Sequence, residues 1–128
     1  MTGTADIATT LNEIQTKLQA DPSIDGVLTL NPDIAIAARD AIAGAGSSAK
    51  LATFDLSGDV IAGIKDGSIL FAIDQQQYLQ GYLPVVFLYL FKTNLNTVGG
   101  GLPVLTGPGF VDKSNADAIE KLAQAGTR

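Results

Sequence analysis

Three polar side chains follow three expected strands of this 128-residue sequence: Asn31, Asp55 and Gln75, the last directly after Asp74. Amide groups donate and accept hydrogen bonds and carboxylates accept them, so the set can pair with the hydroxyl groups of a neutral ligand. Ligands of open parallel sheets bind at the carboxyl ends of the strands. Because neighbouring strands lie about 4.8 Å apart, we expect the three side chains within about 10–12 Å of each other. The set predicts a binding site for a monosaccharide or polyol.

Each of these residues also has a structural explanation. Asn31 precedes Pro32, which is typical of a helix N-cap followed by proline at the first helical position. Asp55 could cap the next helix or form a turn, and Gln75 could belong to a polar loop. Their shared position after three successive strands favours a common site.

The composition excludes several other kinds of site. The sequence contains no cysteine and no histidine, so disulfides, thiolate catalysis, Cys-based metal sites and imidazole bases are excluded. Only two of the 13 acidic residues are glutamates, and the aspartates are spread singly along the chain. We therefore expect no catalytic residue, no metal ligand and no cofactor.

Three rival chemistries lack part of their residue set. A phosphoacceptor receiver domain would need an acidic pair near Asp55 and a lysine after a late strand, and the sequence offers neither. The glycine-rich stretches 99–101 and 107–109 carry no phosphate-binding pattern. Glycoside hydrolysis needs two carboxyl groups in different protonation states. Asp55 and Asp74 could lie close together, but structural or binding aspartates are far commoner.

Charge and hydropathy limit the partners. The net charge is −5 and the eight basic residues never cluster, so we expect no nucleic-acid binding. The most apolar run, Leu83 to Phe91, has nine residues, whereas a membrane span needs about 20. Residues 1–6 contain neither a positive nor an apolar segment, so we expect no secretory signal.

Apolar periodicity and turn residues predict alternating helices and strands. Three alternations with short connections are typical of right-handed parallel βαβ units, so we expect a doubly wound, three-layer α/β/α parallel sheet in a single domain over 1–128. The expected helices are Ile7–Leu18, Pro32–Ile42, a short one after Ser57 or Asp59, Tyr78–Leu90, and one after a capping box at 114–117 that ends at Gly126; the expected strands are 26–30, 50–54, 68–73 and 102–106.

The helix Tyr78–Leu90 is apolar around more than half of its circumference. One face of a small sheet cannot cover such a surface, so we expect this helix to be buried on two sides. Pro84 lies inside it and predicts a kink near Gln80.

Three motifs resemble the C-terminal half of a ribose-binding-protein-like periplasmic sugar-binding protein: VLTLNPD at 27–33, ATFD at 52–55 and FAIDQQQYLQGY at 71–82. LTGPGFV at 105–111 extends the resemblance over essentially the whole chain, although sugar-responsive repressors share this fold. The resemblance implies two lobes that grip a sugar, with Asn31, Asp55 and Gln75 as contacts of the C-terminal lobe. Residues 76–106 would be the segment that crosses to the other lobe.

The resemblance further implies that the full-length relative is periplasmic and delivers sugar to the membrane subunits of an ATP-driven importer. The sequence shows no counterpart of the N-terminal lobe, so we expect a fragment that binds sugar weakly and performs no catalysis. An unpaired edge on the strand at 27–30 and the apolar helix predict a homodimer, with a domain swap as one form. The alternative function is an oligomerisation or interaction module with a vestigial sugar cleft; a sugar hydrolase ranks below both.

Overall fold

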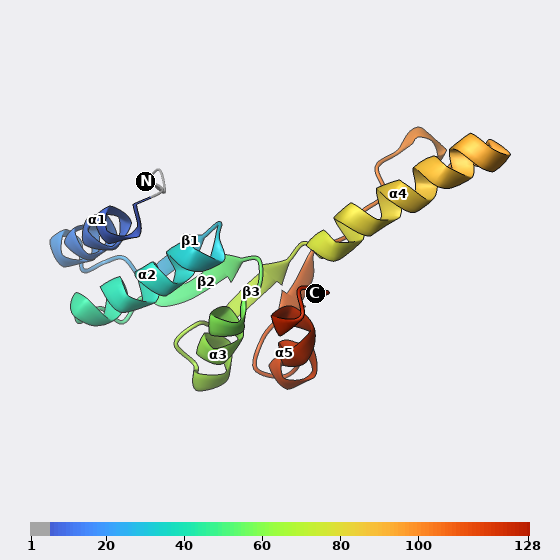
Figure 1. Cartoon of the computed structure of the whole chain (residues 1–128). Helices are drawn as coiled ribbons and strands as arrows, with labels where there is room; N and C mark the ends of the chain where they lie inside the picture. Colours follow the sequence, from blue (N-terminus) through green and yellow to red (C-terminus); the bar gives the residue numbers. More distant parts are fainter. Residues whose placement is uncertain (1–5) are drawn as a thin grey trace.

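The computed structural model describes residues 6–128, which form a small mixed α/β body and one projecting helix (Figure 1). The elements in chain order are α1 (Ile7–Ala20), β1 (Gly26–Thr29), α2 (Pro32–Gly44), β2 (Lys50–Phe54), α3 (Gly58–Asp66), β3 (Phe71–Asp74), α4 (Gln77–Asn94), a 3-10 turn (Gly99–Gly101), β4 (Gly109–Val111) and α5 (Ala116–Gln124).

The four strands form one sheet in the order β1-β2-β3-β4. The first three strands are parallel, and their register pairs Thr29 with Thr53 and Phe54 with Ile73. The fourth strand is antiparallel to β3 and pairs Gly109 with Asp74. The expected mixed α/β fold with a parallel sheet flanked by helices is confirmed. The carboxyl ends of the three parallel strands lie at one edge of the sheet.

The two faces of the sheet differ in burial. Leu51, Thr53 and Ala72 point to the covered face, where α2 packs on β1 and β2 and α3 packs on β3. Both βαβ crossovers run in the same direction across the sheet, so right-handed connections place α2 and α3 on the same face. On the other face Leu28 and Phe110 are each 57% exposed. Among the described residues, helices contact one face of this sheet, so these residues form two layers and not the three layers of the expected doubly wound α/β/α arrangement.

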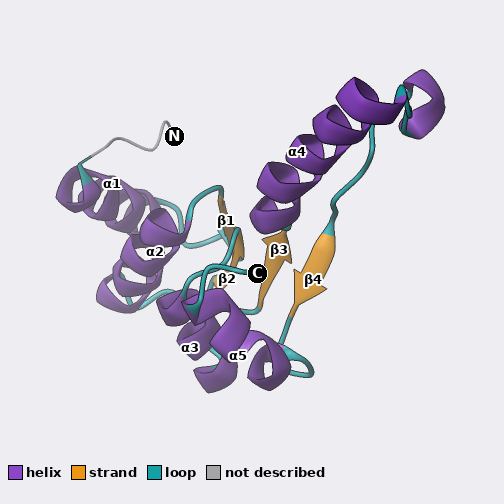
Figure 2. Ribbon diagram, turned by 45° about the vertical axis from the view of Figure 1, so that its right-hand side comes forward, coloured by secondary structure: helices purple, strands orange, loops and turns teal. Residues whose placement is uncertain are grey.

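The remaining helices of the body extend this layer sideways. The helix α1 packs along α2, and Gln15 Nε2 of α1 donates to the carbonyl of Gly44 in α2 at 3.1 Å. Beside α3 lies α5, where Lys65 forms ion pairs with Asp117 at 2.8 Å and with Glu120 at 3.0 Å (Figure 2). Hydrogen bonds to Asp117 and then to Glu120 raise the pKa of Lys65 above its ordinary value. The helices are therefore tied to one another as well as to the sheet.

The helix α4 leaves the body and extends beyond the ends of β3 and β4 (Figures 1 and 2). It continues as one helix from Gln77 to Asn94 through Pro84, and the kink near Gln80 stays a prediction. None of its residues is buried, so the two-sided apolar surface has no full cover within the described residues. None of the described helices combines the length and hydropathy that a membrane crossing requires.

Two local predictions were wrong. The segment 102–106 forms no strand, because it lies against α4 rather than beside the sheet, and the fourth strand is Gly109–Val111 instead. Ser114 does not cap α5; its hydroxyl and backbone N–H donate to Asp112 Oδ1, at 2.5 and 2.8 Å, and lower the pKa of that carboxyl group. Ser114 thus stabilises the loop before α5 and not the helix. Asn115 occupies the N-cap position, and its side chain forms no capping hydrogen bond.

A pair of helical glycines tests the packing of the covered face. A Cβ on Gly63 would lie 2.8 Å from Cδ1 of the buried Ile69, whereas a Cβ on Gly81 would meet nothing within 4 Å. Overpacking costs about 1–3 kcal/mol, and alanine gains about 1 kcal/mol over glycine in a helix. In urea unfolding, the free energy of unfolding of Gly63→Ala should therefore fall about 2 kcal/mol below that of the control Gly81→Ala. Equal values would contradict the tight packing of α3.

Candidate ligand-binding site

Asp55 and Gln75 meet at the carboxyl edge of the sheet. Gln75 Nε2 donates to Asp55 Oδ1 at 2.8 Å. Asp55 directly follows β2 and is half-buried, with a left-handed backbone (φ 68°), whereas Gln75 directly follows β3 and is exposed. The structure thus brings together two of the three predicted side chains. The second carboxylate oxygen of Asp55 is free to accept from a ligand hydroxyl.

Asn31 stands at the same edge but serves its own helix. Its Oδ1 accepts from the backbone N–H groups of Asp33 at 2.8 Å and Ile34 at 3.4 Å, so the expected N-cap is confirmed. Because Thr29 pairs with Thr53, Asn31 and Asp55 lie equally far beyond paired residues of neighbouring strands. No hydrogen bond joins Asn31 to Asp55 or Gln75. Its carboxamide nitrogen is the group available to a ligand.

A buried hydroxyl pair lies beneath this edge. Thr29 Oγ1 donates to Thr53 Oγ1 at 2.7 Å, and Thr53 Oγ1 donates to the Phe54 carbonyl at 3.0 Å. A satisfied polar network of this kind fixes neighbouring strands relative to one another. This pair could not be recognised from the sequence, because β-branched residues at matching places in successive strands are also typical of ordinary buried strands.

The crossing between β3 and α4 lies side by side with the return toward β4. Thr106 Oγ1 donates to the Gln75 carbonyl at 2.9 Å, and Gln80 Nε2 reaches both that carbonyl and Thr106 Oγ1, at 3.0 and 3.1 Å. Gln76 Nε2 donates to the Thr106 carbonyl. We name this cluster of Gln75, Gln76, Gln80 and Thr106 the hinge clamp. Only the glutamine run at 75–77 hinted at it in the sequence.

Asp74 turns away from the edge into the protein. Its side chain is fully buried and forms an ion pair with Arg128, Nε to Oδ2, at 2.7 Å. Asp55 forms its hydrogen bond with Gln75 instead. The two aspartates thus differ in burial and in hydrogen-bond partner.

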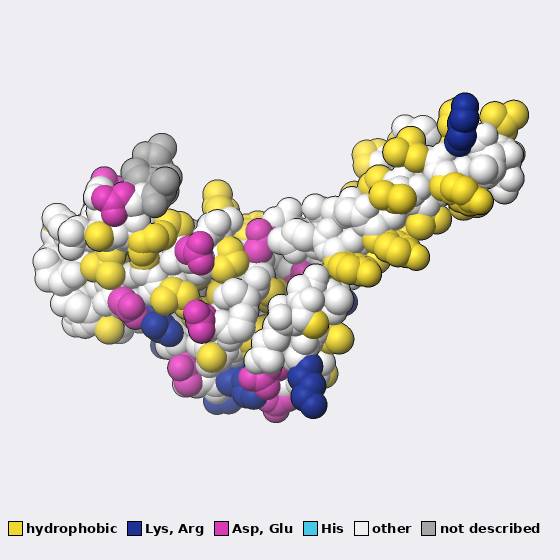
Figure 3. All heavy atoms as spheres, in the orientation of Figure 1, with side chains coloured by type: hydrophobic (Ala, Val, Ile, Leu, Met, Phe, Trp, Pro, Cys, Tyr) yellow, Lys and Arg dark blue, Asp and Glu magenta, His cyan; other side chains and the backbone are white. Residues whose placement is uncertain are grey.

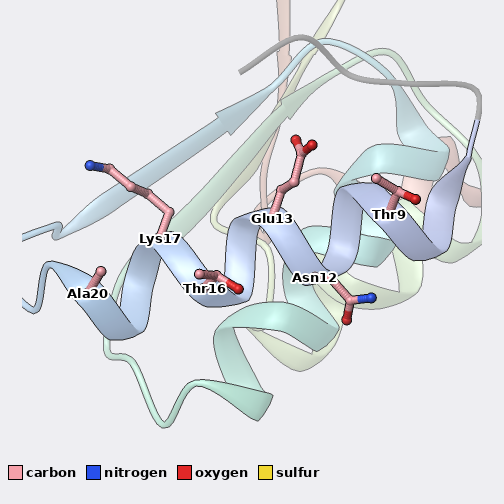
Figure 4. A pocket seen from close by; sticks show the side chains of 6 residues that line it. All are labelled: Thr9, Asn12, Glu13, Thr16, Lys17 and Ala20. Atoms are coloured by element: carbon pink, nitrogen blue, oxygen red, sulfur yellow. The ribbon is translucent and has the colours of Figure 1, made fainter.

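Two of the grooves lined by described residues lie along the helices α1 and α4, outside this edge. An open groove runs along a single side of α1 (Figure 4), and its residues are Thr9, Asn12, Glu13, Thr16, Lys17 and Ala20. A second, apolar groove lies between α4 and the segment 102–106, with Gln80 and Thr106 of the hinge clamp among its lining residues. Neither groove includes Asn31, Asp55 or Gln75. The polar edge of the sheet is thus separate from both grooves.

Comparison with known proteins gives one family. The family described as "Periplasmic binding protein domain" matches residues 2–92. A carbohydrate transporter from Acidothermus cellulolyticus 11B, solved in complex with myo-inositol, superposes with a TM-score of 0.92 and 51% identity over 97% of this chain and 43% of its own.

Other relatives are more distant or match a shorter segment. The xylose/arabinose-binding protein XylF of Sulfolobus acidocaldarius is 42% identical over 62 residues, which are 48% of this chain and 15% of the relative. The periplasmic binding component of the arabinose ABC transporter from Shewanella sp. ANA-3 shares the fold, with a TM-score of 0.75, 20% identity and coverage of 98% of this chain and 43% of its own. This chain thus spans less than half the length of these relatives.

The N-cap bonds of Asn31 predict a measurable structural role. Replacing an N-cap asparagine by alanine costs about 1 kcal/mol, whereas aspartate caps equally well. In urea unfolding, Asn31→Ala should lower the free energy of unfolding by about that amount, and Asn31→Asp should retain it. Asn12→Ala, at an exposed position inside α1, is the control and should not destabilise. An unchanged stability of Asn31→Ala would mean that the cap contributes nothing.

Proposed function

The chain belongs to the periplasmic binding protein domain family, and from this premise we propose that it binds a monosaccharide or polyol as the C-terminal part of a solute-binding protein for sugar import. The observation that carries the proposal is the Asp55–Gln75 pair at the carboxyl edge of the sheet, next to the hinge clamp. A relative that is 51% identical in sequence over 97% of this chain was solved with myo-inositol bound, and it supports the ligand class. We propose binding without catalysis. The relatives give no support to the alternative of an interaction module.

Three side chains supply the proposed hydrogen bonds to the ligand. Asp55 accepts from ligand hydroxyls through the carboxylate oxygen that Gln75 leaves free. Gln75 keeps its carboxamide oxygen as an acceptor, and Asn31 donates through its carboxamide nitrogen because its oxygen caps α2. Vicinal hydroxyls both donate and accept, so this mixture suits a polyol better than a charged ligand.

The crossing segment has a role in the same proposal. Residues 76–106 carry α4 away from the body and return to β4, as expected of a segment that enters a second lobe. The apolar groove between α4 and 102–106 would then be covered by that lobe. In the whole protein we propose a periplasmic location and the membrane subunits of an importer as partners.

The proposal predicts weak binding by this chain alone. An open edge supplies about half of the contacts of a closed cleft and does not exclude water, so we expect millimolar or undetectable affinity for myo-inositol and arabinose. In titrations followed by NMR, ligand-dependent shifts should gather at Asn31, Asp55 and Gln75. Asp55→Asn should abolish them. Asp25→Asn, at an exposed aspartate before the opposite edge of the sheet, is the control and should not.

Two outcomes would contradict this proposal. Shifts that gather on the α1 groove instead of the strand ends would place the site elsewhere. Micromolar affinity by calorimetry would show that one lobe is sufficient for tight binding.

We also propose that this chain alone forms a homodimer. Hydrophobic side chains gather along the projecting helix (Figure 3), where Tyr82 is 56% and Val85 68% exposed. Burying about 600 Å² of such surface would contribute about 15 kcal/mol, against an association cost of about 4–15 kcal/mol. The edge strand β1 pairs on one side with β2 and is a second surface for self-association. Exchange of α4 between two chains would give a domain-swapped form.

Phe87→Asp separates these interfaces. Phe87 lines the groove of α4, so a charge there should convert a dimer built on this helix into a monomer of about 13 kDa, measured by light scattering at micromolar concentration. Gln19→Asp, which adds the same charge to the exposed surface of α1, should leave the dimer intact. A wild-type monomer would refute the proposal, and a Phe87→Asp dimer would move the interface to β1.

A further inference from the structure

Asp74 is a buried carboxylate with a partner on each oxygen. Its exposure is 0%, Oδ1 accepts from the backbone N–H of Gln76 at 2.7 Å, and Oδ2 accepts from Arg128 Nε at 2.7 Å. A buried charge is tolerated only where it is paired and hydrogen-bonded. The Arg128 guanidinium is therefore the group that allows the Asp74 carboxylate to remain inside the protein and to hold the Gln76 backbone.

The path of the chain after α5 delivers Arg128 to this place. Gly126 has a left-handed backbone (φ 67°), and Thr127 N donates back to the Leu122 carbonyl at 3.0 Å, so the chain turns sharply after the helix. The guanidinium also lies against the return strand, because a Cβ on Gly109 would lie 3.5 Å from Arg128 Nη2. Arg128 thus pairs with Asp74 at the end of β3 and lies close to Gly109 at the start of β4.

The turn that Asp74 holds is strained and lies next to the candidate site. Gln76 is not a glycine but has a left-handed backbone (φ 57°), a conformation that costs energy for most residues and persists where the surroundings impose it. The hydrogen bond from Gln76 N to Asp74 Oδ1 is one such restraint. Gln75 lies between these two residues, and its side chain reaches Asp55 from within this turn.

We propose that Arg128 is a positioning residue of the binding edge. By fixing the Asp74 carboxylate it holds the turn Asp74–Gln76, and from this turn Gln75 is aimed at Asp55. The last step, the effect on a sugar ligand, rests on the proposed function; the effect on the turn does not.

Hydrogen exchange on the full chain without ligand tests the turn. Hydrogen bonds to charged groups are stronger than neutral ones, so Arg128→Met should speed exchange of the Gln76 amide by about 10- to 100-fold and shift the side-chain amide resonances of Gln75. Arg128→Lys should restore part of the protection. Arg39→Met is the matched control, since Arg39 pairs with Asp40 at the surface, and it should leave Gln76 unchanged. The amides of β2 report on global unfolding and should keep their protection in all variants.

A second pair of variants keeps the test decisive if Arg128→Met does not fold. Asp74→Asn retains an oxygen for the Gln76 amide without a buried charge, and it is compared with the double variant Asp74→Asn/Arg128→Met. Faster Gln76 exchange in the double variant supports the positioning role. Unchanged exchange in that variant, or in a folded Arg128→Met, overturns it.

The effect of Arg128 on ligand binding is measured separately, with myo-inositol as the probe. Weaker myo-inositol-dependent shifts in Arg128→Met than in Arg39→Met would extend the positioning role to the site. Myo-inositol-dependent shifts that gather on the α1 groove, together with faster Gln76 exchange in Arg128→Met, would refute the proposed function and uphold the positioning role.

Discussion

Parallel pairing of β1, β2 and β3 is the constraint on which the rest of the structure depends. Parallel strands need a crossover between them, so the chain must return over a face of the sheet each time, and right-handedness places α2 and α3 on the same face. The same pairing brings all three carboxyl ends to one edge. The covered core and the polar edge are thus two results of one arrangement of hydrogen bonds, and the threonine pair beneath the edge joins them.

One-sided burial explains the remainder of the surface. The covered face holds the buried side chains of the strands, whereas the other face leaves Leu28 and Phe110 in solvent and α4 has no buried residue. Surfaces of this kind are rarely left free in soluble proteins. In the relatives this part of the fold is less than half of a longer chain. The rest of such a chain is the partner that we propose for these surfaces.

Local signals predicted most of the body. Asn31-Pro32 located the start of α2, Ser57 proved to be the cap of α3 and the apolar run 50–54 matched β2, because each depends on residues within one turn or one strand. The pair Asp55–Gln75 followed from topology alone. The fourth strand, Gly109–Val111, was not predicted, because a segment of only three residues becomes a strand through its pairing with β3. The ion pair of Asp74 was missed because its partner is 54 residues away, beyond the reach of any periodicity.

The chemistry of the hinge clamp has a consequence for how the crossing responds to its surroundings. Every bond that links Thr106 to Gln75, Gln76 and Gln80 joins an amide, a hydroxyl or a carbonyl group, and none of these groups titrates. Dissolved ions screen interactions between exposed charges but weaken hydrogen bonds between neutral groups very little. The bonds of the hinge clamp therefore depend little on salinity and acidity, whereas the adjoining Asp74–Arg128 pair consists of two charged groups.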